Sequence, residues 1–170
     1  MADFVIRKGQ MEDLDTLMEI YAHAREFMAE HGNESQWGPT QWPPRNLIAQ
    51  DIEQGTCHVA EYDGRIAATF FYDAGEDCEP CYRVIEDGSW ADDTAYGVVH
   101  RIASAHIVGG AGQACLTWAL EQTPHLRIDT HKDNIPLQTL LKKLGFSHRG
   151  TIYVYEDEQP RMAFEHVAAS

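Results

Sequence analysis

The stretch that most constrains the fold is GGAG at residues 109–112, a glycine-rich loop between two apolar runs. The run before it, residues 96–103, predicts a buried strand, and the run after it, residues 111–121, predicts a helix. Glycines at the start of a helix leave backbone N–H groups accessible, and the helix dipole favours negative charge there. From the loop alone, two interpretations stay open: a cradle for a phosphate-bearing ligand, or a plain strand-to-helix turn.

The loop departs from the two common nucleotide-binding patterns. A P-loop needs a lysine followed by serine or threonine after its last glycine, but Gln113 and Ala114 follow Gly112 here. A dinucleotide loop reads G-x-G-x-x-G, and Cys115 stands where its third glycine belongs. The sequence therefore excludes a P-loop and matches a nucleotide-linked oxidoreductase poorly.

Strand and helix patterns alternate along the rest of the chain. Asp63-Gly64 between two apolar runs is typical of a hairpin turn, and Asn134 and Gly145 are typical of the start and end of a helix. The predicted strands are residues 4–7, 58–62, 66–72, 96–103, 126–131, 146–154 and 162–167. The predicted helices are residues 11–31, 44–55, 82–86, 111–121 and 134–145. This order predicts one mixed α/β domain over residues 1–170.

The composition limits the classes of partner. Thirteen Lys and Arg against 27 Asp and Glu give a net charge of −14, which argues against nucleic acid because its binding depends on neutralising phosphates. The same charge is compatible with a cationic small substrate such as an amine. No apolar run approaches the ~20 residues that cross a bilayer, and the N-terminus lacks the apolar core of a signal peptide. We therefore expect a soluble cytoplasmic protein that binds neither nucleic acid nor membrane.

Two short polar patterns resemble metal sites without meeting the requirements of one. Cys78 and Cys81 form a C-x-x-C pair within a turn-like segment, but no second Cys or His pair has the spacing of a zinc site. Asp129, His131 and Asp133 alternate at a strand end, where exposed polar residues are the ordinary explanation. We expect no metal, and free thiols rather than disulfides.

The two segments around the glycine loop together resemble a known family. VVHRIASAHIVGGAGQACLTWAL at residues 98–120 and RIDTHKDNIPLQTLLKKLGF at residues 127–146 are similar to the Gcn5-related N-acetyltransferase (GNAT) superfamily. The order of elements from about Phe4 to Val167 is similar too. The resemblance implies a central, mostly antiparallel sheet of about seven strands, splayed between the fourth and fifth, with about four flanking helices. It also implies an acyltransferase.

The resemblance implies a place for acetyl-CoA as the co-substrate, without a metal. The glycine loop corresponds to the family's pyrophosphate loop, and backbone groups near Ile102 and Ala103 correspond to those that hold the pantetheine arm and polarise the thioester. His131 ends the next predicted strand and Asn134 follows it, where both would meet the cofactor. The full set of implied cofactor-binding residues is Ile102, Ala103, Val108, Gly109, Gly110, Ala111, Gly112, Gln113, His131 and Asn134.

Two positions depart from the family pattern. Ile107 stands where the pyrophosphate loop usually has Arg or Gln, so phosphate binding would depend more on backbone N–H groups. Leu141 stands where many members have a tyrosine that protonates the departing thiolate, so the usual acid is missing. A cofactor-binding module with little or no transferase activity is therefore the alternative to an N-acetyltransferase.

The residues that would handle the acceptor amine are less well defined. His100 on the central strand is a candidate base, since its ordinary pKa is near ~6.5, although a core histidine is the simpler explanation because Val98 and Ile102 share its face. Backbone groups at Ala103 complete the predicted catalytic set. Trp37 and Trp42 fall where the family builds its acceptor pocket, or else they cover the core. We expect a small-molecule or peptide amine as acceptor, and the resemblance adds a homodimer as one option.

Overall fold

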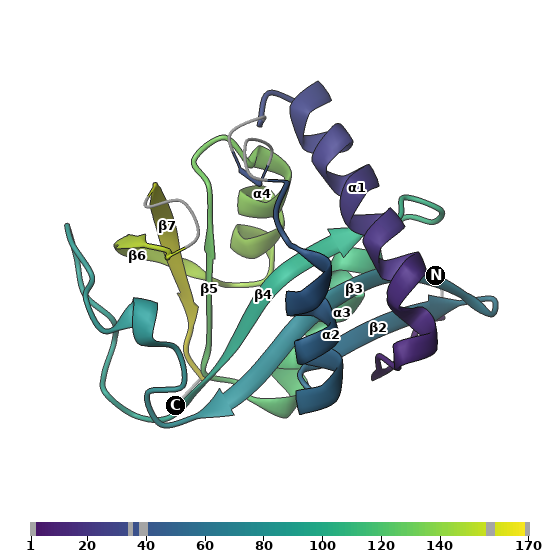
Figure 1. Cartoon of the computed structure of the whole chain (residues 1–170). Helices are drawn as coiled ribbons and strands as arrows, with labels where there is room; N and C mark the ends of the chain where they lie inside the picture. The colour runs from purple at the N-terminus through teal and green to yellow at the C-terminus, as the bar shows by residue number, and fades with distance from the viewer. Residues whose placement is uncertain (1–2, 34–35, 38–40, 156–158, 169–170) are drawn as a thin grey trace. The chain divides into compact units, whose positions relative to one another are not determined.

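The computed structural model describes residues 3–33, 36–37, 41–155 and 159–168. Within these residues, seven strands form a sheet in the order β1-β2-β3-β4-β5-β7-β6, accompanied by four α-helices (Figure 1). The sheet is mostly antiparallel, and β4 and β5 form a parallel pair. This confirms the predicted mixed α/β fold class and its seven strands.

Contacts divide the chain into two units, each assembled from two separate stretches of sequence. The first unit comprises residues 1–72 and 100–118, and the second comprises residues 73–99 and 119–170. The two halves of β4 fall in different units, as do the two ends of α3. The expectation of a single domain over residues 1–170 stays a prediction.

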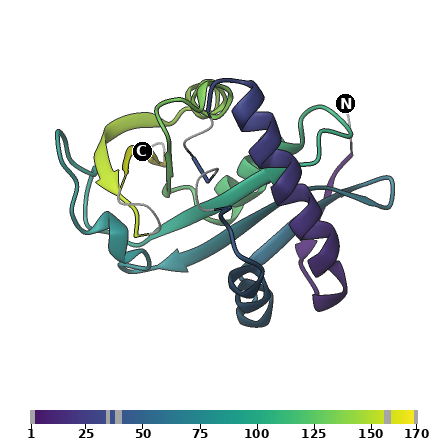
Figure 2. The same ribbon diagram turned by 45° about the horizontal axis from the view of Figure 1, so that its top comes forward.

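The first unit has helices on both faces of its strands. Its elements are β1 (Val5–Lys8), a 3₁₀ turn (Met11–Asp13), α1 (Leu14–Glu30), α2 (Arg45–Gln54), β2 (Cys57–Tyr62), most of β3 (Arg65–Gly75), the end of β4 (Tyr96–Ser104) and the start of α3 (Ala111–Gln122). Apolar side chains of α1 and α2 pack with Cys57, Val59 and Ala103 in one core cluster. Trp118 of α3 packs against His58 and Phe70 of the strands. Figures 1 and 2 show α1 and α2 together on one side of β2 and β3.

Local sequence signals explain the turns of this unit. Pro44 caps the start of α2, and Gly55 ends the helix in the left-handed conformation with φ of 77°. Asp63 and Gly64, with φ of 51° and 75°, form the tight turn between β2 and β3. Both features were predicted from the sequence, and the structure confirms them.

The second unit is built on the β4–β5–β7–β6 end of the sheet. Its elements are a 3₁₀ turn (Pro80–Tyr82), the start of β4, the end of α3, β5 (Leu126–Thr130), α4 (Ile135–Lys143), β6 (Ser147–Tyr153) and β7 (Pro160–His166). β5 pairs with β7 along its whole length, from Leu126 opposite His166 to Thr130 opposite Met162. Within this unit, the parallel pairing with β4 involves Gly97 with Leu126 and Val98 with Arg127, at the start of β5. A short β4–β5 pairing is what the predicted splay between the fourth and fifth strands requires.

One predicted helix is wrong. Residues 82–86 were expected to be helical, but the helical turn is the shorter Pro80–Tyr82, and Glu86 forms an isolated antiparallel bridge with Thr151. The bridge satisfies the backbone of Glu86 through two hydrogen bonds of 2.8 Å, which a helix at this point would exclude. Separately, no helix within the described ranges is long and apolar enough to cross a bilayer.

Candidate acyl-transfer site

The glycine loop joins β4 to α3 within the first unit, as predicted. Gly110 has a φ of +89°, a conformation that favours glycine, and its carbonyl accepts the amide of Ala114 at 3.0 Å. This is the first turn of α3, so the amides of Ala111 and Gly112 precede that intrahelical bond. A methyl group placed at Gly109 would meet no atom within 4 Å. The loop therefore combines helix-start N–H groups with open space, which fits a pyrophosphate.

The residues around the loop glycines differ in accessibility. Gly109 and Gly110 are exposed, Val108, Gly112 and Gln113 are half-buried, and Ala111 is buried. Ile107 is 37% exposed and contributes no hydrogen-bonding side chain. Ligand binding by these residues stays a prediction. Their backbone N–H groups, rather than their side chains, are the groups suited to binding a phosphate.

The end of β4 carries an irregularity that the sequence did not reveal. Arg101 has a φ of +51°, which is unusual for a residue with a side chain. Neighbouring strand residues normally point to opposite faces, yet the ring of His100 lies 5.5 Å from that of Phe71 and the Arg101 guanidinium lies 4.7 Å from the same ring. The left-handed residue thus changes the facing of β4 directly before Ile102 and Ala103, the segment predicted to polarise a thioester.

Buried partners hold Arg101 in this conformation. Its Nε and Nη2 donate to Asp51 Oδ2 at 3.1 and 2.8 Å, and the Tyr21 hydroxyl donates to its carbonyl at 2.9 Å. Burial raises the pKa of the Asp51 carboxyl, and the charges of Arg101 and His100 act against that rise. A left-handed non-glycine residue costs about 1–3 kcal/mol, which these contacts offset.

The predicted catalytic residues lie beside this irregularity. His100 is half-buried, and Ala103 is 4% exposed within the core cluster of α1 and α2. Ile102 is half-buried. Their catalytic and cofactor-binding roles stay predictions.

The two tryptophans predicted for the acceptor pocket lie in the first unit. Trp37 is 7% exposed, and its ring packs edge-on against Tyr21 at 5.8 Å. Trp42 is half-buried against the same core cluster, and its carbonyl accepts Arg25 at 3.0 Å. The burial of Trp37 favours the interpretation that it covers the core, and acceptor binding by either residue stays a prediction.

A cavity of about 500 Å³ lies beside the entry to the glycine loop. Its lining includes Ala105 and Ile107 next to the loop, and Glu19 and His23 of α1. Arg7 also lines it and is held by Asp13 at 2.8 Å and by Glu61. These contacts raise the pKa of Arg7, chiefly through the bond to Asp13, so the guanidinium belongs to a structural cluster.

The other two predicted cofactor residues, His131 and Asn134, belong to the second unit. Asn134 is the N-cap of α4, as predicted, and its side-chain oxygen accepts the amide of Leu137 at 3.3 Å. His131 is 4% exposed, and its Nδ1 accepts the amide of Asp133 at 3.1 Å. Both side chains have roles in the turn before α4, and contact with a cofactor stays a prediction for each.

Leu141, which stands in place of the family tyrosine, is completely buried in the second unit. Leu141 lies on α4, the helix that Asn134 caps. An apolar side chain with no exposed surface cannot give a proton to a leaving group. The structure therefore agrees with the departure seen in the sequence.

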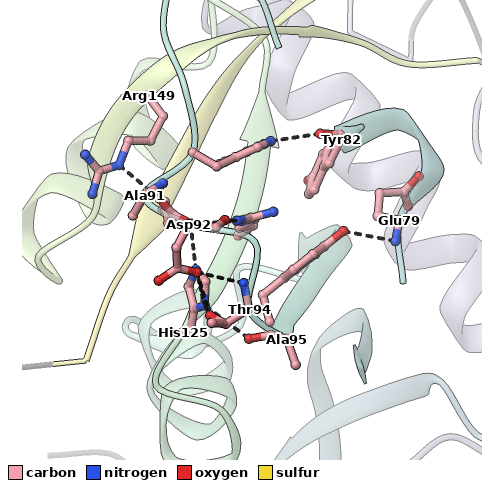
Figure 3. Close-up of polar contacts among 12 residues, drawn as sticks. Glu79, Tyr82, Ala91, Asp92, Thr94, Ala95, His125 and Arg149 are labelled. Carbon is pink, nitrogen blue, oxygen red and sulfur yellow. Dashed lines mark hydrogen bonds and ion pairs between the residues drawn. The ribbon is translucent and has the colours of Figure 1, made fainter. Parts of the chain in front are cut away.

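A charged cluster in the second unit was missed by the sequence analysis (Figure 3). The Glu165 carboxylate, 1% exposed, accepts hydrogen bonds from Arg127 at 2.9 Å, Arg149 at 3.0 Å and the Ala91 amide at 2.9 Å, and pairs with His125 at 2.6 Å. Arg127 also lies over the rings of Trp90 and Tyr96, at 4.3 and 4.1 Å. These contacts fix the segment before β4 to β5 and β7, so we assign the cluster a structural role.

A second contact ties the same segment to β5. The Tyr82 hydroxyl donates to Asp129 Oδ2 at 2.7 Å, and burial raises the pKa of Tyr82 well above its usual value. Tyr82 therefore stays protonated and remains a donor. Trp90 Nε1 in turn donates to the Tyr82 carbonyl at 2.8 Å.

Cysteines and acidic residues in the described part of the chain do not gather into a metal centre. Within the described ranges, no group of three or more His, Cys, Asp or Glu residues is arranged to hold a metal ion. All four cysteines are free, and burial raises the pKa of Cys57 and Cys78 to about 11, so both are thiols at neutral pH.

The missed residues carry one common sequence signal: a charge inside an apolar element. Asp51 lies among Ile48 and Ile52 on α2, and Arg101 interrupts the apolar run of β4. Arg127 and Glu165 are likewise buried within strands, in register across β5 and β7. A buried charge needs a partner of opposite charge. The sequence could therefore have predicted that these residues form buried ion pairs, but only the fold shows which residues pair.

Comparison with known proteins agrees with the family resemblance seen in the sequence. No protein-family profile and no curated protein sequence matches the chain. Among solved structures, a GNAT-family acetyltransferase from Streptococcus agalactiae is 31% identical over 98% of this chain and 96% of its own, with a TM-score of 0.86. A GNAT-family acetyltransferase from Bacillus cereus (19% identity, 99% of each chain, TM-score 0.62) and a ribosomal-protein-alanine N-acetyltransferase from Brucella melitensis (18% identity, 96% of this chain and 99% of that one, TM-score 0.63) share the fold.

The similarity to the streptococcal protein spans nearly the whole chain. Acyl transfer is the chemistry that this kinship supports. The chain belongs to the GNAT family of acetyltransferases.

Proposed function

We propose that the protein is a cytoplasmic, acetyl-CoA-dependent N-acetyltransferase that acts on the primary amine of a small molecule or peptide. The glycine loop carries the proposal. Gly109 borders open space, Gly110 takes the left-handed conformation, and the amides of Ala111 and Gly112 lie at the start of α3. These features suit the pyrophosphate of acetyl-CoA without a basic side chain.

The proposed reaction is direct attack of the amine on the thioester in a ternary complex. An ammonium has no lone pair, so a base must first accept its proton, and we assign that role to His100. The amine nitrogen then bonds to the carbonyl carbon and loses one of its two protons to solvent, the carbon–sulfur bond breaks, and CoA leaves as a thiolate that takes up a proton from solvent. Backbone groups near Ile102 and Ala103 polarise the carbonyl in this scheme.

The acceptor is proposed to be a positively charged or neutral amine held near Trp37 and Trp42. Aromatic faces attract cations and pack against apolar groups. The net charge of −14 also favours a cationic acceptor over an anionic one.

A second candidate is an acyl-CoA-binding module with little or no transferase activity. The buried Leu141 at the position of the family tyrosine favours it, because the leaving thiolate would lack that acid. Both candidates bind acetyl-CoA, but only the N-acetyltransferase transfers its acetyl group to an amine.

Calorimetric titration with acetyl-CoA tests the shared part of both candidates. Gly109→Asp places a negative charge in open space at the loop and should weaken binding about tenfold. Thr117→Asp is the matched control, since it adds the same charge to an exposed position further along α3. Failure of the wild-type protein to bind acetyl-CoA would refute both candidates, and equal weakening by the two variants would place the phosphates elsewhere.

Release of free CoA with a panel of amines then separates the two candidates. An N-acetyltransferase releases thiol with at least one amine and yields a product heavier by one acetyl group. A binding module releases none across the panel, although it still binds acetyl-CoA.

A further inference from the structure

An imidazole pair stands directly before the glycine loop. His106 Nδ1 and His23 Nε2 lie 2.8 Å apart, and both residues are exposed. His106 has a φ of +57°, and its amide donates to Ser104 Oγ at 3.0 Å. Gly109 follows His106 by three residues, so the pair lies at the entry to the proposed pyrophosphate cradle.

Stacked rings fix the position of His106. Its ring lies parallel to that of Phe27, with centroids 4.1 Å apart and planes 24° apart. Phe27 stacks in turn on His31, with centroids 3.9 Å apart. An exposed imidazole held by a hydrogen bond and by a ring stack is preorganised, so it loses little rotational freedom when it meets a ligand.

The pair offers a side-chain donor beside a loop whose own donors are backbone N–H groups. A neutral imidazole has one N–H and one acceptor nitrogen, so one ring of the pair donates to the other. If His106 Nδ1 accepts from His23, the proton of His106 resides on Nε2, which points away from the bond and is available to donate. Ile107, the next residue, offers no such group.

We propose that His106, held by His23, binds a phosphate of acetyl-CoA beside the glycine loop. This inference rests on the proposed function, because it assumes acetyl-CoA as the donor. The pyrophosphate and the 3′-phosphate of CoA offer the same chemistry, an anionic oxygen for a charged or neutral imidazole.

Protonation links this contact to pH. Partial burial lowers the pKa of His106 in the free protein, and the positive charges of His23 and His31 lower it further. A bound phosphate would raise that pKa, so binding takes up protons and becomes stronger as pH falls through the bound-state value. The neighbouring titratable groups are His23 of α1 and His31 at the C-terminal cap of that helix, together with Glu19 and Arg65 in the adjacent cavity lining.

The test is calorimetric titration of the full chain with acetyl-CoA at about pH 6 and about pH 8, in buffers of different ionisation enthalpy. The wild-type protein should bind about fivefold more tightly at the lower pH and take up a fraction of a proton, as one titrating imidazole requires. Titration with 3′-dephospho-CoA locates the phosphate: a retained pH dependence assigns the pyrophosphate, and a lost one assigns the 3′-phosphate.

Two substitutions at His106 separate a phosphate contact from a structural role. His106→Asn tolerates the left-handed backbone and should remove both the pH dependence and the proton uptake. His106→Lys carries a permanent charge, so it should bind tightly at both pH values. His148→Gln, at an exposed histidine on β6, is the control and should behave as the wild type.

The outcomes distinguish this inference from the function on which it rests. If the wild type fails to bind acetyl-CoA at either pH, the proposed function and this inference both fall. If the wild type binds and His106→Asn keeps its pH dependence, or if the wild type binds equally at both pH values, only the imidazole contact is refuted.

Discussion

Arg127 and Glu165 face each other in register across β5 and β7, and their side chains, 2.9 Å apart, are almost completely buried. The apolar neighbours Leu126, Ile128, Ala163 and Phe164 on the two strands are buried too, so neither charge would be tolerated there alone. The pair is completed by His125 and Arg149, which also contact the Glu165 carboxylate. The position of a whole segment, residues 90–96, depends on this one carboxylate through the Ala91 amide and the rings over Arg127.

Glu165→Gln should destabilise the protein by about 3–5 kcal/mol at neutral pH, because it leaves Arg127 buried without its counter-charge. Burial alone would raise the pKa of Glu165, but the hydrogen bonds from His125, Ala91 and Arg127 outweigh it, and the pKa lies below its usual 4.5. A lowered pKa stabilises the fold above pH 4.5, and that contribution is lost as pH falls through the folded-state value. Urea unfolding from about pH 7 to about pH 3 should show that the difference in unfolding free energy between wild type and variant decreases only in the acid range. A difference in unfolding free energy that stays constant down to about pH 3 would contradict the role of the ionised Glu165 carboxylate.

Asp51→Asn tests the support of the β4 irregularity. The Asp51 and Arg101 side chains are 6% and 14% exposed, so loss of the carboxylate should lower the unfolding free energy by about 3–5 kcal/mol. Asp15→Asn is the control, since Asp15 pairs with Arg45 on the surface at 83% exposure and should cost less than about 1 kcal/mol. Equal effects of the two substitutions in urea unfolding would show that the buried pair is not special.

The sequence predicted the elements well because each has strong local signals. The caps of α2 and α4, the Asp63-Gly64 turn and the glycine loop depend on residues adjacent in the chain, and the structure agrees with all of them. The helix expected at residues 82–86 failed because a distant partner, Thr151, takes the backbone of Glu86 into a bridge. Tertiary pairing overrode a weak local preference there.

The candidate site also contains features that the sequence predicts and features that only the fold shows. The loop glycines are visible in the sequence, because their role depends on local backbone freedom. The Asp51–Arg101 pair and the His23–His106 pair join residues 50 and 83 positions apart, so only the fold brings them together. The left-handed φ of Arg101 has no local signal, since arginine is not a residue that favours it.

Gly88→Ala tests the close contact beside the Glu86–Thr151 bridge. A methyl group at Gly88 would lie 1.8 Å from the Arg149 carbonyl oxygen, a backbone atom that cannot simply rotate away. We expect a loss of about 1–3 kcal/mol or more in unfolding free energy, as overpacking produces. Gly109→Ala, which meets open space, is the matched control and should leave stability within about 1 kcal/mol. An unchanged melting temperature in Gly88→Ala would show that this segment is not held where the bridge places it.

Leu141→Tyr asks whether the missing acid can be restored by one substitution. Leu141 is fully buried, so a larger ring must displace neighbours, and its hydroxyl would need a buried partner. We expect a lower melting temperature and no gain in CoA release, whereas Leu141→Ala should cost about 2–5 kcal/mol through the cavity it leaves. Leu140→Ala, at a half-buried neighbour on the same helix, should cost less and serves as the control. The rate of CoA release is measured with an accepted amine. A higher rate in Leu141→Tyr would instead show that a side chain at this position reaches the leaving thiolate, and that leucine there limits turnover in the wild-type protein.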